Sequence, residues 1–399
     1  MSQPINSSKI TSDASHAHDW TWHLWPLVPI YPYGKRRTLR IEVLNDRIWT
    51  FDQVQGIFYV VVPIRMTVVR LDAGGLLVYA PVAPTPECLR LMQELVDKYG
   101  AVRYIILPTV SGIEHKVFVG PFARHFPTAQ VYVSPHQWSF PLNLPLSWLG
   151  LPPDRTHILP ADSRQTPFGD EIDYAVLGAI NLNVGAFAEV AMVHRPTHTL
   201  LLTDMIVSVP EEPPAIVQLD PYPLLFHAKD HASEVVADTP ANRRKGWHRI
   251  SLFAFYFRPS VLDTLDLGQT VLNALKAVDR SRKAYFGLYP FRWQPNWHYA
   301  FQALCGHSRP FVAPVLQQLI LNRAPQTTLA WVDRVAQWEF NHIIPCHFMA
   351  PIPASPRQFR QAFAFLDPQA TGDRLPDADV QLLRELEAGL VQRKILPPV

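Results

Sequence analysis

Residues 103–135 read RYIILPTVSGIEHKVFVGPFARHFPTAQVYVSP. A β-branched and aromatic run that begins one residue earlier covers residues 102–107, which is long enough for a buried strand and too short for a helix. A proline, a serine and a glycine then break the run. A helical pattern follows over residues 115–126, and a second short apolar run follows at 130–133. The predicted order is strand, loop, helix and strand, which is the building unit of an α/β sheet.

The loop between the first strand and the helix carries two adjacent polar side chains, Glu114 and His115. Polar side chains at the carboxyl ends of strands line the crevice where an α/β sheet binds its ligands. We therefore expect this loop to contribute to the functional site.

Upstream of this unit the sequence predicts a β-rich section and one clear helix. The Gly74-Gly75 pair is a hairpin turn signal. The helix spans residues 86–99, since a proline begins it and Gly100 follows its last apolar position. A Trp- and Pro-rich arm over residues 20–33 is expected to pack back on the body, with an anchor for a partner or a membrane surface as the alternative. The strands are expected at 47–52, 57–62, 66–71 and 76–79.

Downstream, a second β-rich section begins near residue 171 and is followed by helices. An insertion is expected at about 205–260, and a helix over 327–338 carries the apolar stripe of a helix that lies on a sheet. The sequence thus divides into a polar tail and arm (1–33), one main domain (34–350) and a helical extension (351–399). The strands of this section are expected at 174–177, 187–193, 199–203 and 342–345.

Composition narrows the class of protein. The 399 residues are 48% apolar and 18% charged, as in a folded globular chain, and a net charge of +2 with mixed signs gives no reason to expect nucleic acid. No apolar run is long enough to span a membrane, and the polar first residues do not resemble a secretory signal. Three scattered cysteines do not form a disulfide framework, so we expect a cytoplasmic protein; they are Cys88, Cys305 and Cys346.

These elements resemble the metallo-β-lactamase, or metallo-hydrolase, fold. The resemblance rests on the hairpin-linked strands, on the loop with Glu114 and His115, on a strand that ends in Thr203-Asp204, and on the final strand IIPCHF with His347. The runs EHKVFVGPFARHFPTAQVYVSPHQWSFP and NRRKGWHRISLFAFYF are more narrowly similar to an uncharacterised branch of that fold, a domain of unknown function found in cyanobacteria and plants. The resemblance implies a four-layer α-β-β-α sandwich with insertions.

The expected metal ligands depart from the pattern of the hydrolytic members. Where those proteins read His-x-His-x-Asp-His, residues 110–115 read VSGIEH, so the first two histidines are missing. A third ligand of that first metal site would fall near Glu189. The second site, by the resemblance, keeps a metal-competent side chain at every position; its residues are Glu114, His115, Asp204 and His347.

Mixed carboxylate and imidazole ligands suit one zinc ion and would also accept iron or manganese. The alternative is that these side chains hold no ion and bond to one another in a filled pocket. Three functions follow: a hydrolase of unknown small-molecule substrate with a degenerate, single-metal site, acting on an ester or thioester; a non-catalytic binding or interaction scaffold; and an iron-centred redox enzyme. The sequence contains no Gly-x-Ser-x-Gly elbow, phosphate-binding loop or dinucleotide motif.

Overall fold

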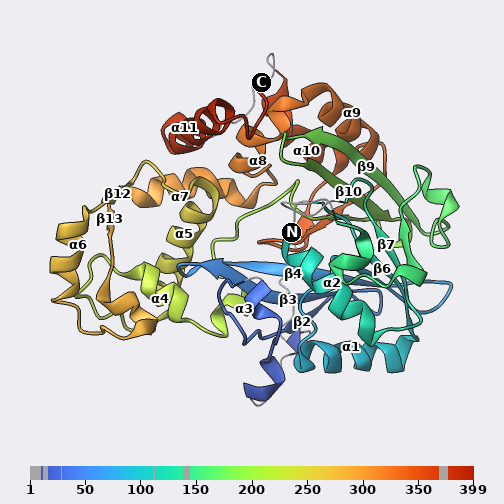
Figure 1. The fold of residues 1–399 in the computed structure, drawn as a ribbon, viewed down its shortest axis with the longest axis horizontal. Coiled ribbons are helices and arrows are strands. Elements are labelled where there is room, and N and C mark those ends of the chain that lie inside the picture. Colours follow the sequence, from blue (N-terminus) through green and yellow to red (C-terminus); the bar gives the residue numbers. More distant parts are fainter. Residues whose placement is uncertain (1–9, 12–16, 28, 111–112, 138–143, 368–375) are drawn as a thin grey trace.

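The structure is a computed structural model that describes residues 10–11, 17–27, 29–110, 113–137, 144–367 and 376–399. Two β-sheets lie face to face with helices on both outer faces, and a mainly helical lobe extends from one side (Figure 1). The predicted four-layer α-β-β-α arrangement is therefore confirmed.

The first sheet has eight strands in the order in which they occur in the chain. Its first five strands pair antiparallel, and the pairs from β5 to β8 are parallel. Its strands are β1 (Ile10–Thr11), β2 (Leu39–Leu44), β3 (Ile48–Ile57), β4 (Val60–Arg70), β5 (Leu76–Tyr79), β6 (Val102–Leu107), β7 (Gln130–Val133) and β8 (Thr156–Ile158).

One expected strand of this sheet, 57–62, was wrong. The chain instead turns within that stretch, at Phe58 and Tyr59, which have positive φ values of 50° and 62°. The two long strands β3 and β4 pair on either side of this turn. Glycine and asparagine favour such backbone angles, whereas two aromatic residues give no turn signal in the sequence.

The second sheet has five strands in the order β15-β14-β11-β10-β9. The neighbouring strands β11 and β14 run parallel, and the other pairs are antiparallel. A large part of the chain therefore leaves the sheet after β11 and returns at β14. The strands are β9 (Ile172–Asn181), β10 (Ala186–His194), β11 (Thr199–Leu202), β14 (His342–Pro345) and β15 (Ile352–Pro353).

Three apolar layers hold the sandwich together. Residues of both sheets form the central layer, for example Ile106 of β6 with Val190 of β10. Helices α1 (Pro86–Tyr99) and α2 (Ile113–His125) cover the outer face of the first sheet. Helices α9 (Pro325–Val335) and α10 (Pro356–Gln361) cover the second, where Trp331 and Phe359 are buried. Helix α9 begins and ends earlier than the predicted 327–338.

The boundaries of α1 show how local sequence fixes an element. The side chain of Thr85 accepts a hydrogen bond from the backbone N–H of Cys88, and Pro86 occupies the first helical position. Gly100 ends the helix with a φ of 96°. The predicted and observed helices coincide because each of these signals is local.

The Trp-rich arm packs on this side of the sandwich at its start, as expected, whereas Trp25 and Leu27 in its middle are exposed. The indole of Trp22 is buried and meets the ring of Phe118 edge-on at 5.4 Å. Trp20 lies against the guanidinium of Arg37, 4.4 Å from ring centre to Cζ.

The part of the chain between β11 and α8 forms the lobe seen at the left of Figure 1, and α9 then returns to the second sheet before β14. Helices α4 and α5 can pack closely because residue 246 is a glycine. A Cβ atom at this position would lie only 1.8 Å from the carbonyl oxygen of Leu224. Strands β12 and β13 lie within the section expected to be helical, and they pair antiparallel. The elements are α3 (Ala215–Gln218), α4 (Tyr222–Ala228), α5 (Pro240–Tyr256), β12 (Leu262–Thr264), α6 (Leu267–Ala274), β13 (Phe291–Trp293), α7 (Trp297–Cys305) and α8 (Pro314–Leu319), and α11 (Asp377–Gln392) follows the second sheet.

Candidate functional site

Two parallel strands bring Asp204 and His347 together. The last paired residues of β11 and β14 are Leu202 and Pro345, which are partners in the register. Asp204 and His347 follow these partners at the same offset, so both side chains emerge at one edge of the sheet. Nε2 of His347 lies 3.1 Å from Oδ1 of Asp204. This contact is the centre of the candidate site.

The second ring nitrogen of His347 is fixed by the first sheet. Its Nδ1 lies 2.8 Å from the carbonyl oxygen of Pro63 in β4, so Nδ1 carries a proton and donates it. The remaining nitrogen, Nε2, faces the carboxylate of Asp204. Both ring nitrogens thus face acceptors, which suits the doubly protonated imidazolium. An ion bound at Nε2 would take the place of that second proton.

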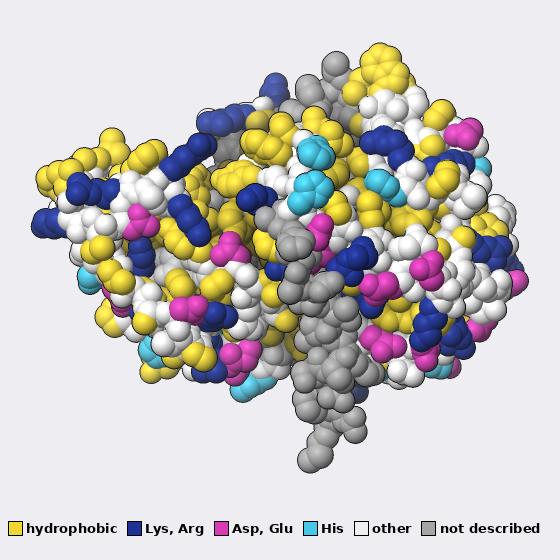
Figure 2. Space-filling view, turned by 90° about the horizontal axis from the view of Figure 1, so that it is seen from below, with side chains coloured by type: hydrophobic (Ala, Val, Ile, Leu, Met, Phe, Trp, Pro, Cys, Tyr) yellow, Lys and Arg dark blue, Asp and Glu magenta, His cyan; other side chains and the backbone are white. Residues whose placement is uncertain are grey.

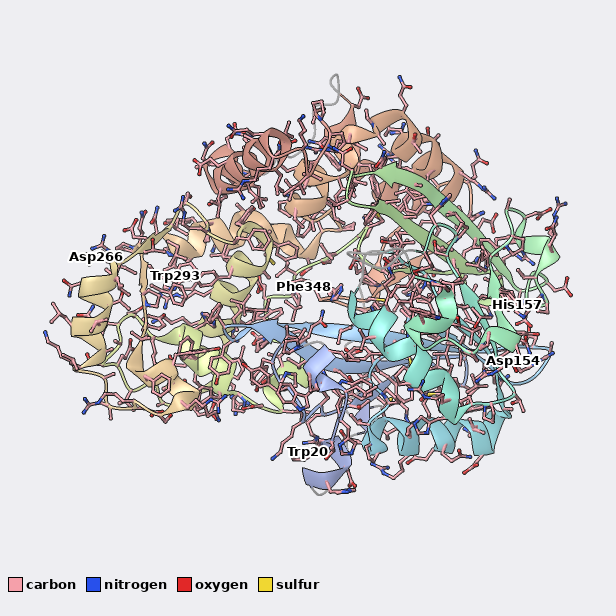
Figure 3. The ribbon with its side chains drawn as sticks, viewed as in Figure 1. Trp20, Asp154, His157, Asp266, Trp293 and Phe348 are labelled. Carbon is pink, nitrogen blue, oxygen red and sulfur yellow. The ribbon has the colours of Figure 1, made fainter. Side chains whose placement is uncertain are left out.

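A buried ion pair positions the loop that carries His347. The guanidinium of Arg65 binds both carboxylate oxygens of Asp52, with contacts of 2.8 and 2.7 Å, and each side chain is only 3% exposed. The same guanidinium donates to the carbonyl oxygens of Pro345, at 2.8 Å, and Phe348, at 3.0 Å. Phe348 lies near the middle of the molecule, beside the first sheet (Figure 3). Arg65 therefore holds the backbone on both sides of His347.

His115 approaches the site from the first turn of α2. Its side chain is 1% exposed, and its Nδ1 donates to the carbonyl oxygen of Pro81 at 3.1 Å. This bond orients the ring so that Nε2 is the atom that could bind a metal ion. The position of His115 is close enough for its charge to act on the carboxylate of Asp204.

Glu114 precedes His115 in α2, but its side chain lies outside the described part of the structure, as do residues 111–112. Val110 of the same loop is buried, and its backbone N–H donates to the carbonyl oxygen of Ala188 at 3.1 Å. The N–H of Val190 donates in turn to the carbonyl oxygen of Pro108 at 2.7 Å. The loop after β6 is thus tied to β10, which joins the two sheets beside the site.

The carboxyl group of Asp204 is subject to opposing effects. Burial raises its pKa, while the hydrogen bond from His347 and the positive charges of His347 and His115 lower it. The net result is a pKa below the ordinary value for aspartate. Since its side chain remains 27% exposed, the group can reach a ligand.

Glu189 lies beside Asp204 but faces backbone groups. A β-bulge between Phe187 and Glu189 shifts the register of β10 against β9. The fully buried carboxylate accepts the backbone N–H groups of Thr203 at 2.8 Å and of Asp204 at 3.0 Å, one on each oxygen. Burial, followed by the negative charge of Asp204, raises the pKa of Glu189 to about 7. Glu189 therefore holds the loop that carries Asp204.

The expected ligand set is only partly assembled by the described side chains. Asp204 and His347 are in contact, and His115 lies near them. Within the ranges given above, no three His, Cys, Asp or Glu side chains are grouped as a metal site requires. Glu114 would be a further donor, and its side chain is not described.

Sequence reasoning missed the Arg65–Asp52 pair. A signal was present, because Arg65 interrupts the apolar run VVVPIRMTVV, and an arginine within a buried strand requires a partner. The partner itself could not be identified from the sequence. Asp52 lies opposite Arg65 in the β3–β4 ladder, and that ladder depends on the turn that the sequence did not signal.

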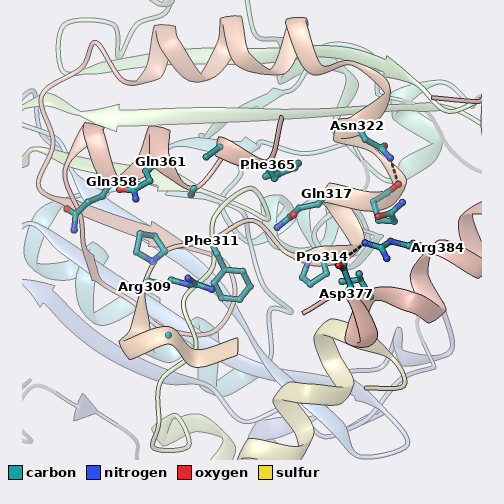
Figure 4. A pocket seen from close by; sticks show the side chains of 16 residues that line it. Arg309, Phe311, Pro314, Gln317, Asn322, Gln358, Gln361, Phe365, Asp377 and Arg384 are labelled. Carbon is teal, nitrogen blue, oxygen red and sulfur yellow. Dashed lines mark hydrogen bonds and ion pairs between the residues drawn. The ribbon is translucent and has the colours of Figure 1, made fainter. Parts of the chain in front are cut away.

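A separate pocket of about 620 Å³ lies between α8, α10 and α11. Carboxamide side chains, two aromatic rings and two arginines line it, and Arg384 is paired with Asp377 at one side (Figure 4). Phe311 of this pocket contacts Phe255 at 5.2 Å between ring centres, and Phe255 stacks on Phe348 at 4.6 Å. Packed aromatic rings therefore connect the pocket to the loop that carries His347.

Comparison with known proteins places the chain in a family. A family profile described as domain of unknown function DUF4336 matches residues 45–365, so the chain belongs to that family. No curated protein matches the sequence.

Solved structures, including metallo-β-lactamases, are similar to it at low identity. The mono-zinc form of the metallo-β-lactamase FIM-1 from Pseudomonas aeruginosa is 10% identical, with coverage of 83% of this chain and 94% of that one and a TM-score of 0.38. A metallo-β-lactamase from Hirschia baltica is 8% identical, with coverage of 84% and 99% and a TM-score of 0.37. A diflavin flavoprotein fragment from Nostoc sp. PCC 7120 is 12% identical, with coverage of 89% and 99% and a TM-score of 0.39.

Proposed function

We propose that this protein is a metal-dependent hydrolase that uses a reduced site for one divalent ion. Glu114, His115, Asp204 and His347 would hold the ion. The observation that carries the proposal is the pair of backbone bonds that fix the Nδ1 atoms of His347 and His115, with the carboxylate of Asp204 near both rings. Histidines that bind metals are commonly held in this way, with one nitrogen bonded to a carbonyl group and the other left for the ion.

The chemical types of the four expected ligands suit one divalent ion. Carboxylate oxygens and imidazole nitrogens are ligands of zinc and are also accepted by iron and manganese. A bound ion with an open position lowers the pKa of water to about 7 and so supplies a hydroxide nucleophile. The ionised state of Asp204, favoured by the two histidines, is the state that binds a cation.

The protein's own residues would orient this chemistry. Arg65 fixes the backbone around His347, and Glu189 fixes the loop of Asp204, so neither ligand has to be ordered on binding. The substrate class we propose is a small molecule with an ester or thioester bond, since the attack of hydroxide on an acyl carbon requires no further cofactor.

A non-catalytic binding scaffold is the second candidate. It is favoured by the saturation of Glu189, whose two carboxylate oxygens both accept backbone N–H groups. It is also favoured by the direct pairing of Asp204 with His347, which satisfies both groups without an ion.

Metal content distinguishes the two functions. The wild type, His347→Ala and a control, His231→Ala, are loaded with zinc, iron or manganese and dialysed, and the bound metal is measured for each chain. His231 is exposed and bonds to Ser233, so its loss leaves the site intact. We expect one ion in the wild type and the control and none in His347→Ala.

Thermal unfolding with and without a chelator completes the test. Binding to the native state alone stabilises a protein by about 2.7 kcal/mol at a hundredfold excess over the dissociation constant. The chelator should therefore lower the unfolding midpoint of the loaded wild type and leave that of His347→Ala unchanged. If the wild type holds no ion after the loading step and its unfolding midpoint does not change with chelator, the result would contradict the hydrolase and support the scaffold.

A further inference from the structure

The outer end of the lobe exposes a row of aliphatic side chains on α6 and the residues after it. The row lies at one end of the long axis of the molecule. Helix α6 is at that end, and Asp266 is its N-cap residue (Figures 1 and 3). Its members are Leu267 (80% exposed), Val271 (46%), Leu272 (57%), Leu275 (63%) and Val278 (72%).

This exposure is not the result of a poorly packed helix. The opposite side of the same segment is buried through small side chains, namely Thr270, Ala274 and Ala277. The segment is amphipathic with its larger side chains outside, which is the reverse of a helix that stabilises its own lobe. Exposed apolar patches of this kind mark surfaces that contact another body.

The apolar surface continues beyond α6. Phe286, at the end of the next turn, is 63% exposed. Its neighbour Tyr285 contacts the ring of Phe58 at 5.6 Å, and Phe58 is 65% exposed at the tip of the β3–β4 hairpin. Two exposed aromatic rings therefore accompany the aliphatic row.

Basic side chains surround this surface. Lys276, Arg280 and Arg282 are exposed, and none of them has an acidic partner in the described part of the chain. Lys283 is also exposed and lies over the ring of Tyr222, 4.0 Å from its centre. Figure 2 shows Lys and Arg side chains beside apolar ones at this end of the molecule.

The two acidic groups of the segment are engaged locally. Asp266 caps α6 by accepting the backbone N–H of Gln269, and Asp279 accepts the N–H of Ser281. Residues 266–288 contain four basic side chains against these two acids. The surface is therefore apolar with a positively charged border.

We propose that this surface, α6 with the residues up to 288, docks on a membrane that contains anionic lipids. Aliphatic side chains flanked by Lys and Arg are typical of helices that lie in the membrane interface, where the apolar groups enter the lipid and the bases meet the headgroups. None of the described helices is long and apolar enough to cross a bilayer, so the contact is with the surface.

Charge and composition favour a membrane over other occupants. A second copy of the chain would bring a second set of the same positive charges to the contact, whereas a surface of anionic lipids supplies the opposite charge. The row itself consists of leucine and valine alone, and such aliphatic side chains enter the apolar part of a membrane while the neighbouring bases meet anionic headgroups.

Vesicle flotation tests the proposal. The full chain is mixed with vesicles of phosphatidylcholine alone or of phosphatidylcholine with phosphatidylserine, and the bound fraction is measured. We expect binding to the serine-containing vesicles only. The variant Leu272→Gln/Leu275→Gln should lower the partition constant on the order of tenfold for each leucine, since a buried leucine contributes about as much as a tenfold change in affinity. Arg280→Gln/Arg282→Gln should lower it about fivefold for each arginine.

Two control variants replace an exposed aliphatic residue and an exposed base in other parts of the protein. Val184 is 41% exposed in the turn between β9 and β10 of the second sheet, and Arg357 is an exposed base on α10. Val184→Gln and Arg357→Gln should bind vesicles like the wild type. Because every substituted side chain is exposed, unchanged unfolding midpoints are expected for all variants.

Three results would overturn the proposal. The first is that no vesicles bind, or that binding does not depend on phosphatidylserine. The second is that the wild type forms dimers without lipid and the leucine variant does not, which would assign the surface to a second copy. The third is binding to soluble polyglutamate without binding to vesicles, which would assign it to an acidic protein.

Discussion

His347 and Asp204 stand at matching positions on two parallel neighbours: each follows the last paired residue of its strand at the same offset, and their side chains meet at 3.1 Å. The strands themselves are separated by the whole lobe in the sequence. The candidate site therefore depends on the β11–β14 pairing, and these two side chains move together with that pair.

We predict that metal affinity rises with pH. In the absence of an ion, both nitrogens of His347 face acceptors, so binding at Nε2 must release a proton. Calorimetric titration with zinc at pH 6 and pH 8, in buffers of different ionisation enthalpy, measures both affinity and proton release. Affinity that does not change with pH, with no proton released, would contradict this role of His347.

We predict that Glu189→Gln removes one component of the pH dependence of stability. The native pKa of Glu189 is about 7, above its value in an unfolded chain, so the native protein binds the extra proton between the two values. This group therefore stabilises the fold at acid pH, and its contribution is lost as the pH rises through about 7, with a slope of at most about 1.4 kcal/mol per pH unit.

The measurement is the free energy of unfolding from pH 5 to pH 8 in both proteins. The difference between them should change over this range and level off above it. Asp204 does not alter this comparison. Its pKa is lowered, so its contribution to the free energy of unfolding is lost only as the pH falls below the range of ordinary aspartates. Parallel curves for the two proteins would show that Glu189 does not titrate there.

We predict that Arg65→Met is strongly destabilising, by about 3–5 kcal/mol, because it leaves the charge of Asp52 buried without its partner. The double variant Arg65→Met/Asp52→Leu should recover part of this loss in denaturant titrations. It should not recover metal binding, since the carbonyl groups of Pro345 and Phe348 would still lack their donor. A double variant that binds metal as the wild type does would show that the site does not depend on the Arg65–Asp52 ion pair.

We predict opposite effects for two glycine-to-alanine changes in helices. Gly246→Ala places a Cβ atom 1.8 Å from the backbone of α4, so α4 and α5 must separate and the protein should lose more than about 3 kcal/mol of stability. Gly389→Ala in α11 meets nothing within 4 Å and should stabilise the protein by about 0.5–1 kcal/mol. Equal effects on the free energy of unfolding would argue against the close approach of α4 and α5.

The parts of the fold that follow from the sequence are those with local signals. Pro86 and Gly100 mark the ends of α1, and the run at residues 102–107 coincides with β6. The β3–β4 turn was missed because Phe58 and Tyr59 adopt positive φ without glycine or asparagine. Burial against Phe226 and other rings holds Tyr59 there, and that packing is tertiary.

Parts of the candidate site also follow from the sequence, and other parts do not. Asp204 and His347 could be expected together because both follow short apolar strands that the family resemblance makes neighbours. The role of Glu189 could not, because it depends on a bulge in β10 and on N–H groups presented by a different strand end. The function of the four expected ligands as a metal site remains a prediction.

The reach of Arg65 has a consequence for how the protein is made. The carbonyl group of Pro345 that it binds lies 280 residues further along the chain. During synthesis Arg65 and Asp52 leave the ribosome long before β14 exists, so their ion pair first forms in an incomplete sandwich, and the site can form only after β14 has been made. A ribosome stalled before β14 should therefore display a nascent chain whose first sheet is accessible to proteases and chaperones, and release of β14 should protect it.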